Sequence, residues 1–295
     1  MNQITSQARL PESASISRLI LTAEAGNTSQ AVYQFTGPLP FRAYEIEKLD
    51  KGERHKEELW LLKIPGQYLT EDFPVEAVHT WMASQGAMAD EGQQLLTFHG
   101  TQIVWSAHCI AIMADDSVME SVVRSCLEHL YYLRELNRIE AELQEMWPQA
   151  EQDVSMAFEF NQSQLLKRPN LKQRFQQALL MQGRLSRMSS RINRPYLYPP
   201  TLASQIGERL CERLQLAHRH ECLCDQLEIL NGLYEQCSQR ASDFVLTRSG
   251  NQLEWIIIIL LLAQILLSGF DMLTSLETTA TTTTATPATS DTTGQ

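Results

Sequence analysis

An uncharged apolar run near the C-terminus constrains the fold of this chain more than any other feature. The run from Trp255 to Phe270 contains no Asp, Glu, Lys or Arg, and with its flanks it covers 21 residues, from Leu253 to Leu273. A helix of that length measures about 31 Å at 1.5 Å per residue, which matches a hydrocarbon core of about 30 Å. The sequence therefore predicts a transmembrane helix rather than a buried core helix or a strand. The residues expected to anchor it are Leu253, Trp255, Ile256, Ile257, Ile258, Ile259, Leu260, Leu261, Leu262, Ile265, Leu266, Leu267 and Phe270.

The charges around the predicted span indicate its orientation. Arg240 and Arg248 precede it, whereas the residues that follow it carry only acidic groups. Because cytoplasmic flanks of membrane helices are rich in Lys and Arg, the larger part before the span is expected in the cytoplasm. Met1 to Ser15 has no apolar core of the kind found in secretory signals. We therefore predict a single-pass, tail-anchored protein of a bacterial inner membrane, with its N-terminal part cytoplasmic and the lipid bilayer as its partner.

Composition excludes some classes of function. The formal net charge is -11 and the sequence has no run of Lys or Arg, so direct binding of nucleic acid is not expected. The six cysteines lie in patterned helical or strand-like sequence, which is typical of reduced thiols rather than of a disulfide framework. The segment from Thr274 to Gln295 is rich in Thr and Ala and is predicted to be disordered.

The patterns before the span predict an α+β fold. We expect a flexible N-terminus over 1–15, a mixed α/β domain over 16–113, a long-helix bundle or coiled coil over 114–250, the one transmembrane helix over 253–273 and the disordered tail over 274–295. Strand-like runs in the α/β domain cover 17–23, 31–35, 59–64, 95–98 and 102–107, with a short helix over 74–86. The last two runs flank the pair His99-Gly100, which is typical of a β-hairpin turn.

Helical periodicity begins near Asp115. Apolar residues recur at helical spacing over 117–146 and again over 171–192, and prolines at 195, 199 and 200 then end the second helix. A third stretch starts at Thr201, a suitable N-cap. It carries a heptad seam, which predicts that this helix packs along a partner, either an earlier helix of the same chain, which we favour, or another copy. The seam residues are Leu216, His220, Leu223, Leu227, Leu230, Tyr234, Cys237, Ala241 and Phe244.

The strongest candidate for a metal site is the cluster His218, His220, Cys222 and Cys224. All four side chains are good zinc ligands. On one helix, however, His218 pairs with Cys222 and His220 with Cys224 at i,i+4, and the two pairs point about 200° apart. One helix cannot gather all four ligands, so these residues remain candidates only with help from another helix, and we predict no metal site.

Other combinations of reactive residues are weaker still. His108 and Cys109 are neighbours, but adjacent residues on a strand point to opposite faces. The sequence has no phosphate-binding glycine loop and no H-E-x-x-H motif. Glutamates at 135, 140, 142 and 145 are expected on the solvated face of a helix. We therefore predict no catalytic residue, no cofactor and no enzyme. The alternative is an enzyme or nucleotide-dependent regulator whose site lies between the α/β domain and the helical bundle, with His99, Trp105 and His108 as contributors.

Several segments resemble one known family. The string Leu253-Glu-Trp-Ile-Ile-Ile258 after a long helix, and Phe98-His-Gly-Thr-Gln-Ile-Val-Trp105 upstream, are similar to signatures of the "required for meiotic nuclear division" family. Ser106 to Ala111 is similar to its Ser-His-x-x-Ala helix start, and Leu227 to Asn231 lies near its Arg-x-x-x-Leu-Asn pattern. The resemblance extends from about Phe98 to Leu267.

This family is a domain of unknown function whose members are anchored near the C-terminus. Mitochondrial members are implicated in supporting translation at the inner membrane, as oligomers rather than as enzymes. The resemblance therefore implies a homo-oligomer with a protein or ribosome partner. Together with the heptad seam and the predicted span, it predicts a non-enzymatic scaffold or tethering protein that holds a cytoplasmic recognition domain at the membrane.

Overall fold

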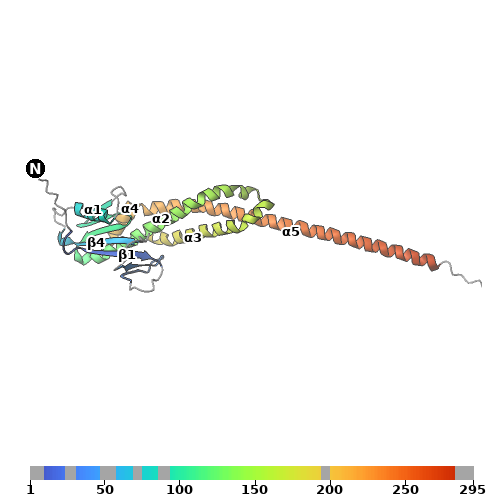
Figure 1. Cartoon of the computed structure of the whole chain (residues 1–295), viewed down its shortest axis with the longest axis horizontal. Helices are drawn as coiled ribbons and strands as arrows, with labels where there is room; N and C mark the ends of the chain where they lie inside the picture. Colours follow the sequence, from blue (N-terminus) through green and yellow to red (C-terminus); the bar gives the residue numbers. More distant parts are fainter. Residues whose placement is uncertain are drawn as a thin grey trace, which may run out of the picture. The chain divides into compact units, whose positions relative to one another are not determined.

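A mixed sheet of seven strands forms the core of the N-terminal part among the described residues (Figure 1). This computed structural model describes residues 10–23, 31–46, 58–68, 75–85, 94–193 and 200–282, with side chains as far as residue 270. The strands lie in the order β2-β3-β1-β4-β7-β6-β5; β4 and β7 pair in parallel and the other neighbours are antiparallel. They are β1 (Ser15–Thr22), β2 (Tyr33–Phe35), β3 (Phe41–Glu45), β4 (Glu58–Pro65), β5 (Gln94–Phe98), β6 (Thr101–Trp105) and β7 (Cys109–Ala114).

Strand β7, which lies between β4 and β6, is covered on both faces. All six of its residues are buried, and an unbroken apolar run is typical of a strand with both faces covered. Cys109, Ala111 and Met113 belong to a core that α1 (Val75–Ser84) completes with Val78 and Met82. The residues that alternate with them point to the other face of the sheet. The seven-stranded sheet followed by long helices confirms the α+β class predicted from the sequence.

The β-hairpin predicted around His99-Gly100 is also confirmed. Strands β5 and β6 pair on either side of these residues, whose φ angles are 46° and 76°. Positive φ at both central residues is the feature of the type I′ turn that matches the twist of paired strands. Strand β3 was not among the predicted strands, because it has only five residues and follows a Gly- and Pro-containing segment.

Two predicted helix boundaries are wrong. Ser106 to Ala111 resembles a helix start, but these residues form a turn and then enter β7, since the apolar run pairs with β4 and β6 on its two sides. The first long helix, expected to end at 146, continues as α2 (Asp116–Phe158) past Pro148. Proline removes one helical hydrogen bond. Burial of Ala150 and Met156 beyond it offsets that loss.

The remaining helices are α3 (Arg168–Ile192), α4 (Leu202–Arg213) and α5 (Leu216–Thr282), with the short 3₁₀ helices η1 (Gly66–Tyr68) and η2 (Gln162–Lys167). The predicted N-cap is confirmed, since the Thr201 hydroxyl accepts a hydrogen bond from the backbone N–H of Ser204 at 3.2 Å. The third predicted stretch is two helices, because the chain turns at Gln215, whose φ is 51°.

By contacts within the chain, the structure falls into two compact units. Unit 1 comprises Met1–Gln152 and Gln173–Leu233, and unit 2 comprises Asp153–Lys172 and Tyr234–Gln295. In unit 1, α5 lies parallel to α2 and antiparallel to α3. Arg219 on α5 pairs with Glu140 on α2, and the Nε2–H of His220 donates to the carbonyl of Leu185 on α3 at 2.9 Å.

The seam residues face these neighbouring helices of the same chain. In unit 1 all five of them are buried, including the one polar member, His220. In unit 2, Tyr234, Cys237 and Ala241 are buried and Phe244 is half-buried. The partner that buries the seam in unit 1 is therefore the same chain, the alternative favoured from the sequence.

Unit 2 contains the end of α2, η2, the start of α3 and the rest of α5. The Cys237 thiol donates to the Asp153 carbonyl at 3.6 Å, and the rings of Phe160 and Phe244 lie 5.9 Å apart. Helix α5 continues to Thr282, nine residues into the segment predicted to be disordered, because no Gly or Pro interrupts its hydrogen bonds there. The rest of that predicted tail, and residues 1–9 of the predicted flexible N-terminus, lie outside the described residues.

Candidate functional site

The apolar part of α5 is the first candidate site. Among the described residues, α5 is the one helix long and apolar enough to cross a membrane, and none of its most apolar 18-residue window is buried in the chain. Trp255, Ile259 and Leu266 leave 61%, 61% and 73% of their surfaces exposed. A continuous exposed apolar surface of this kind is typical of a segment that a membrane or another protein covers. This segment is therefore a candidate membrane span.

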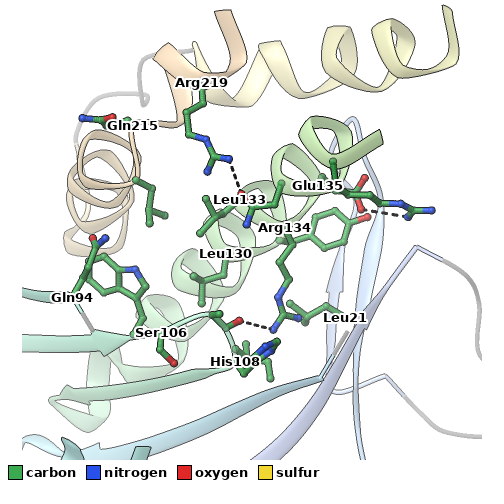
Figure 2. A pocket seen from close by; sticks show the side chains of 18 of the residues that line it. Leu21, Gln94, Ser106, His108, Leu130, Leu133, Arg134, Glu135, Gln215 and Arg219 are labelled. Carbon is green, nitrogen blue, oxygen red and sulfur yellow. Dashed lines mark hydrogen bonds and ion pairs between the residues drawn. The ribbon is translucent and has the colours of Figure 1, made fainter. Parts of the chain in front are cut away.

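The second candidate site is a cleft in unit 1 between the sheet and the helices (Figure 2). Its volume is about 1080 Å³, at the upper end of the range for small-molecule sites. The turn between β6 and β7 lies on one side, α2 on another, and the junction of α4 with α5 on the third. The polar residues that line it are Gln94, Ser106, His108, Arg134, Glu135, Asn137, Arg138, Glu142, Glu145, Arg213, Gln215 and Arg219.

Arg134 fixes the sheet side of the cleft. Its Nη2 donates to the carbonyl of Glu58 on β4 at 2.6 Å and to the carbonyl of Ala107 in the β6–β7 turn at 3.3 Å. Figure 2 shows the second of these bonds. These two bonds hold the β6–β7 turn against α2. The next residue of the turn, His108, is exposed at the edge of the cleft.

The junction of α4 and α5 fixes the opposite side. A non-glycine residue with positive φ is strained, so Gln215 needs its surroundings to hold it there. Leu214 is buried, and the N–H of Arg219 donates to the Gln215 carbonyl at 3.0 Å. The Arg219 side chain crosses to α2, where it donates to the Asn137 amide oxygen at 2.7 Å.

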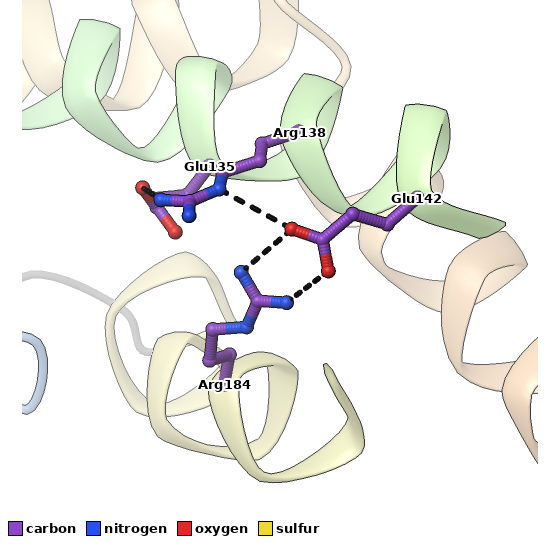
Figure 3. A network of polar contacts seen from close by, with 4 residues as sticks. All are labelled: Glu135, Arg138, Glu142 and Arg184. Atoms are coloured by element: carbon purple, nitrogen blue, oxygen red, sulfur yellow. Dashed lines mark hydrogen bonds and ion pairs between the residues drawn. The ribbon is translucent and has the colours of Figure 1, made fainter. Parts of the chain in front are cut away.

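An ion-pair network borders the cleft along α2 (Figure 3). Arg184 of α3 binds both carboxylate oxygens of Glu142, and Arg138 reaches the same carboxylate at 3.2 Å. Arg138 also lies 3.9 Å from Glu135, whose side chain is only 15% exposed. The prediction of a solvated face holds for Glu145, which is exposed, but Glu135, Glu140 and Glu142 are half-buried. Glu142 pairs with Arg184 of α3 and Glu140 with Arg219 of α5, because the bundle covers a second side of α2.

Of the three residues that the sequence predicted to contribute to a site between the α/β domain and the bundle, the structure brings only two to the cleft. Trp105 and His108 line the cleft, whereas His99 lies in the β5–β6 turn and is not among its lining residues. Cys109 is fully buried next to the exposed His108, so the two neighbours face different environments. Arg134, Arg213 and Arg219 were not singled out from the sequence. Their positions depend on a turn and a helix junction that periodicity does not indicate.

The His and Cys candidates of α5 form two separate pairs. The Cys222 thiol lies 3.8 Å from the His218 Nε2, and the Cys224 thiol lies 3.8 Å from the His220 Nδ1. His218 is exposed and His220 is buried, as expected for pairs on different sides of a helix. Among the described residues, no three His, Cys, Asp or Glu side chains are grouped as a metal ion requires.

The groups with displaced pKa values lie outside the cleft lining. Burial lowers the pKa of His129, whose Nδ1–H donates to the Ser125 carbonyl at 2.7 Å. Burial, with the nearby Glu120, raises the pKa of Tyr33 to about 12. Burial also raises the pKa of the Cys237 thiol to about 11.

These features define the class of the chain as an α+β protein with a long-helix bundle and one C-terminal candidate membrane span. In comparisons with known proteins, no family model matches the sequence and no curated protein is significantly similar to it.

Proposed function

We propose that this chain is a non-enzymatic scaffold or tether that α5 holds in a membrane, with unit 1 as its recognition domain. The observation that carries the proposal is the complete exposure of the apolar window of α5. Ten Ile and Leu residues lie between Trp255 and Phe270. Near the centre of a membrane helix each favours insertion by about 0.3–0.6 kcal/mol. Together they offset the cost of placing the polar Gln264 in the membrane.

A bilayer fits this segment better than a protein surface does. The exposed side chains occupy every side of the helix from Trp255 to Phe270, whereas a helix that packs on a protein is apolar along one face. Arg240 and Arg248 before the span support a cytoplasmic unit 1 at a bacterial inner membrane. We also propose membership of the "required for meiotic nuclear division" family and, with it, a homo-oligomer with a protein or ribosome partner, supported by the string from Leu253 to Ile258.

Alkaline extraction of membranes tests the anchoring. The native chain should stay in the membrane pellet at high pH, whereas the double variant Ile258→Arg/Leu262→Arg should be extracted, because each Arg near the span centre costs about 2.5–3.5 kcal/mol. Leu180→Arg/Ile229→Arg is the matched control, since these apolar side chains of unit 1 are 67% and 62% exposed. This control should pellet like the native chain. Extraction of the native chain itself would contradict the proposal.

The cleft favours a second candidate function, a regulator that binds a nucleotide or a similar anionic ligand. It lies between the sheet and the bundle, has four arginines against three glutamates in its lining, and places Trp105 beside His108. Equilibrium dialysis of the detergent-solubilised chain against labelled ATP and GTP tests it. Binding that Arg213→Gln weakens and Arg187→Gln, an exposed change on α3, leaves intact would support this function. No uptake at millimolar nucleotide would exclude it.

A further inference from the structure

The loop that joins α2 to α3 has a distinctive surface. We define the hairpin tip as residues 158–172. Leu166 exposes 88% of its surface, the largest value among the exposed large apolar residues of the described chain, and Phe158 exposes 73%, as much as Leu266 in the candidate span. Lys167, Arg168 and Lys172 follow Leu166 within six residues and are all exposed. Exposed apolar and basic side chains therefore occur together at this tip.

The positive charge of this region stands out against the chain as a whole. From Phe160 to Gly207 the sequence has eight Lys and Arg residues and not one Asp or Glu, although the net charge of the chain is -11. The basic residues are spaced along a helix and do not form a run, which is why the composition did not indicate them. Farther along α3, Arg184 and Arg191 pair with Glu142 and Glu128 of α2. The three basic residues at the tip face solvent instead.

The hairpin tip belongs to the same compact unit as the candidate span. Phe160, a residue of the tip, contacts Phe244 of α5, and Leu253 follows nine residues later. Nine helical residues measure about 14 Å. A headgroup layer of about 5–8 Å together with a Debye length of about 8 Å covers about the same distance. Charges at the tip therefore lie within electrostatic reach of the headgroups if α5 crosses the bilayer from Leu253.

The helix that enters the membrane does not supply this charge itself. On the part of α5 in unit 2, Arg240 and Arg248 before the span are outnumbered by Glu235, Asp243 and Glu254. A local excess of positive charge occurs instead at the hairpin tip, where Lys167, Arg168 and Lys172 outnumber Glu159, about 80 residues earlier in the sequence.

We propose that the hairpin tip is a second membrane contact, which docks on anionic lipid headgroups while Phe158 and Leu166 enter the interfacial layer. Apolar side chains flanked by Lys and Arg are the composition of elements that lie in a membrane interface, and anionic lipid attracts such segments. This inference rests on anchoring by α5. With two contacts, the membrane fixes the tilt of unit 2 as well as its depth.

Hydrogen exchange of the full chain in nanodiscs tests the tip and the span in one experiment. Discs of zwitterionic lipid are compared with discs that contain about one-third anionic lipid. We expect residues 255–270 to be protected in both. We expect residues 158–172 to exchange about three- to tenfold more slowly in the anionic discs, and this difference should disappear at about 1 M salt.

Charge variants give the matched control. Lys167→Gln/Arg168→Gln/Lys172→Gln should abolish the slowing at the tip and leave the span protected. Arg42→Gln/Lys63→Gln/Arg187→Gln removes the same charge from unit 1 and should leave the slowing in place. Equal exchange of the tip in both kinds of disc, with the span protected, would overturn the tip contact but not the anchor. Exchange of residues 255–270 without protection would overturn both. Tip protection in detergent that rises with protein concentration would show that a second copy covers it, and would also overturn the lipid contact.

Discussion

Phe160 and Phe244 lie with their ring centroids 5.9 Å apart and the rings tilted by 57°, which ties the chain after α2 to α5. An aromatic pair of this kind contributes about 0.5–1.5 kcal/mol beyond the burial of its area. A double-mutant cycle with Phe160→Leu and Phe244→Leu in the detergent-solubilised chain should therefore give a coupling energy of about 1 kcal/mol. The cycle of Phe98→Leu with Phe244→Leu should give none. A coupling indistinguishable from that control would mean that the rings do not hold unit 2 together.

Gly66 should not tolerate a side chain. A Cβ at this position would lie 2.3 Å from the Asp115 Oδ1 and 2.9 Å from the Asp115 backbone nitrogen, where α2 begins. Gly66→Ala should lower the free energy of unfolding by about 2 kcal/mol, because the backbone around Asp115 must move. Gly183→Ala on α3 has open space and should raise it by up to about 1 kcal/mol. Denaturant titration measures both changes, and equal effects of the two variants would contradict the contact.

Stability should fall below neutral pH because of His129. Burial lowers its pKa in the folded protein, while Glu128 raises it and Arg191 lowers it further to smaller extents. Between the ordinary histidine pKa of about 6.5 and the lower folded value, the unfolded chain binds a proton that the folded chain does not. The free energy of unfolding should therefore decrease as pH falls below about 6.5. His129→Gln should flatten this decrease, and the exposed His99→Asn should leave it unchanged.

The cysteines should differ widely in reactivity. Burial raises the pKa of Cys126 strongly and that of Cys237 to about 11, so neither forms much thiolate near neutral pH. Cys222 is exposed on α5. Alkylation at pH 7.5 followed by peptide mass spectrometry should modify Cys222 first, and Cys126 only on unfolding. Early modification of Cys126 would show that the interior of the bundle opens readily.

Local patterns made several parts of the structure predictable. The hairpin at His99-Gly100 and the N-cap at Thr201 depend on neighbouring residues alone, and the sequence indicates both. The heptad positions from Leu216 to Ala241 are buried because helical spacing alone puts them on one side of α5.

Features that depend on distant parts of the chain were not predictable. The cleft needs the β6–β7 turn, α2 and the strained Gln215 together, and no single segment indicates that arrangement. Helix α2 passes Pro148 because its later residues pack in the bundle, a tertiary effect that overrides a local signal. The hairpin tip was missed for a similar reason, since only the folded contact of Phe160 with Phe244 brings it to the part of α5 that precedes the span.

Flotation with neutral vesicles tests anchoring by α5 most directly. The purified full chain is mixed with zwitterionic lipid, the detergent is removed, and the vesicles are floated at 1 M salt, where a Debye length of about 3 Å screens the hairpin tip. The chain should float with the vesicles, and Ile258→Arg/Leu262→Arg should stay at the bottom of the gradient. A native chain that remains at the bottom, soluble and monodisperse without detergent, would contradict a membrane anchor.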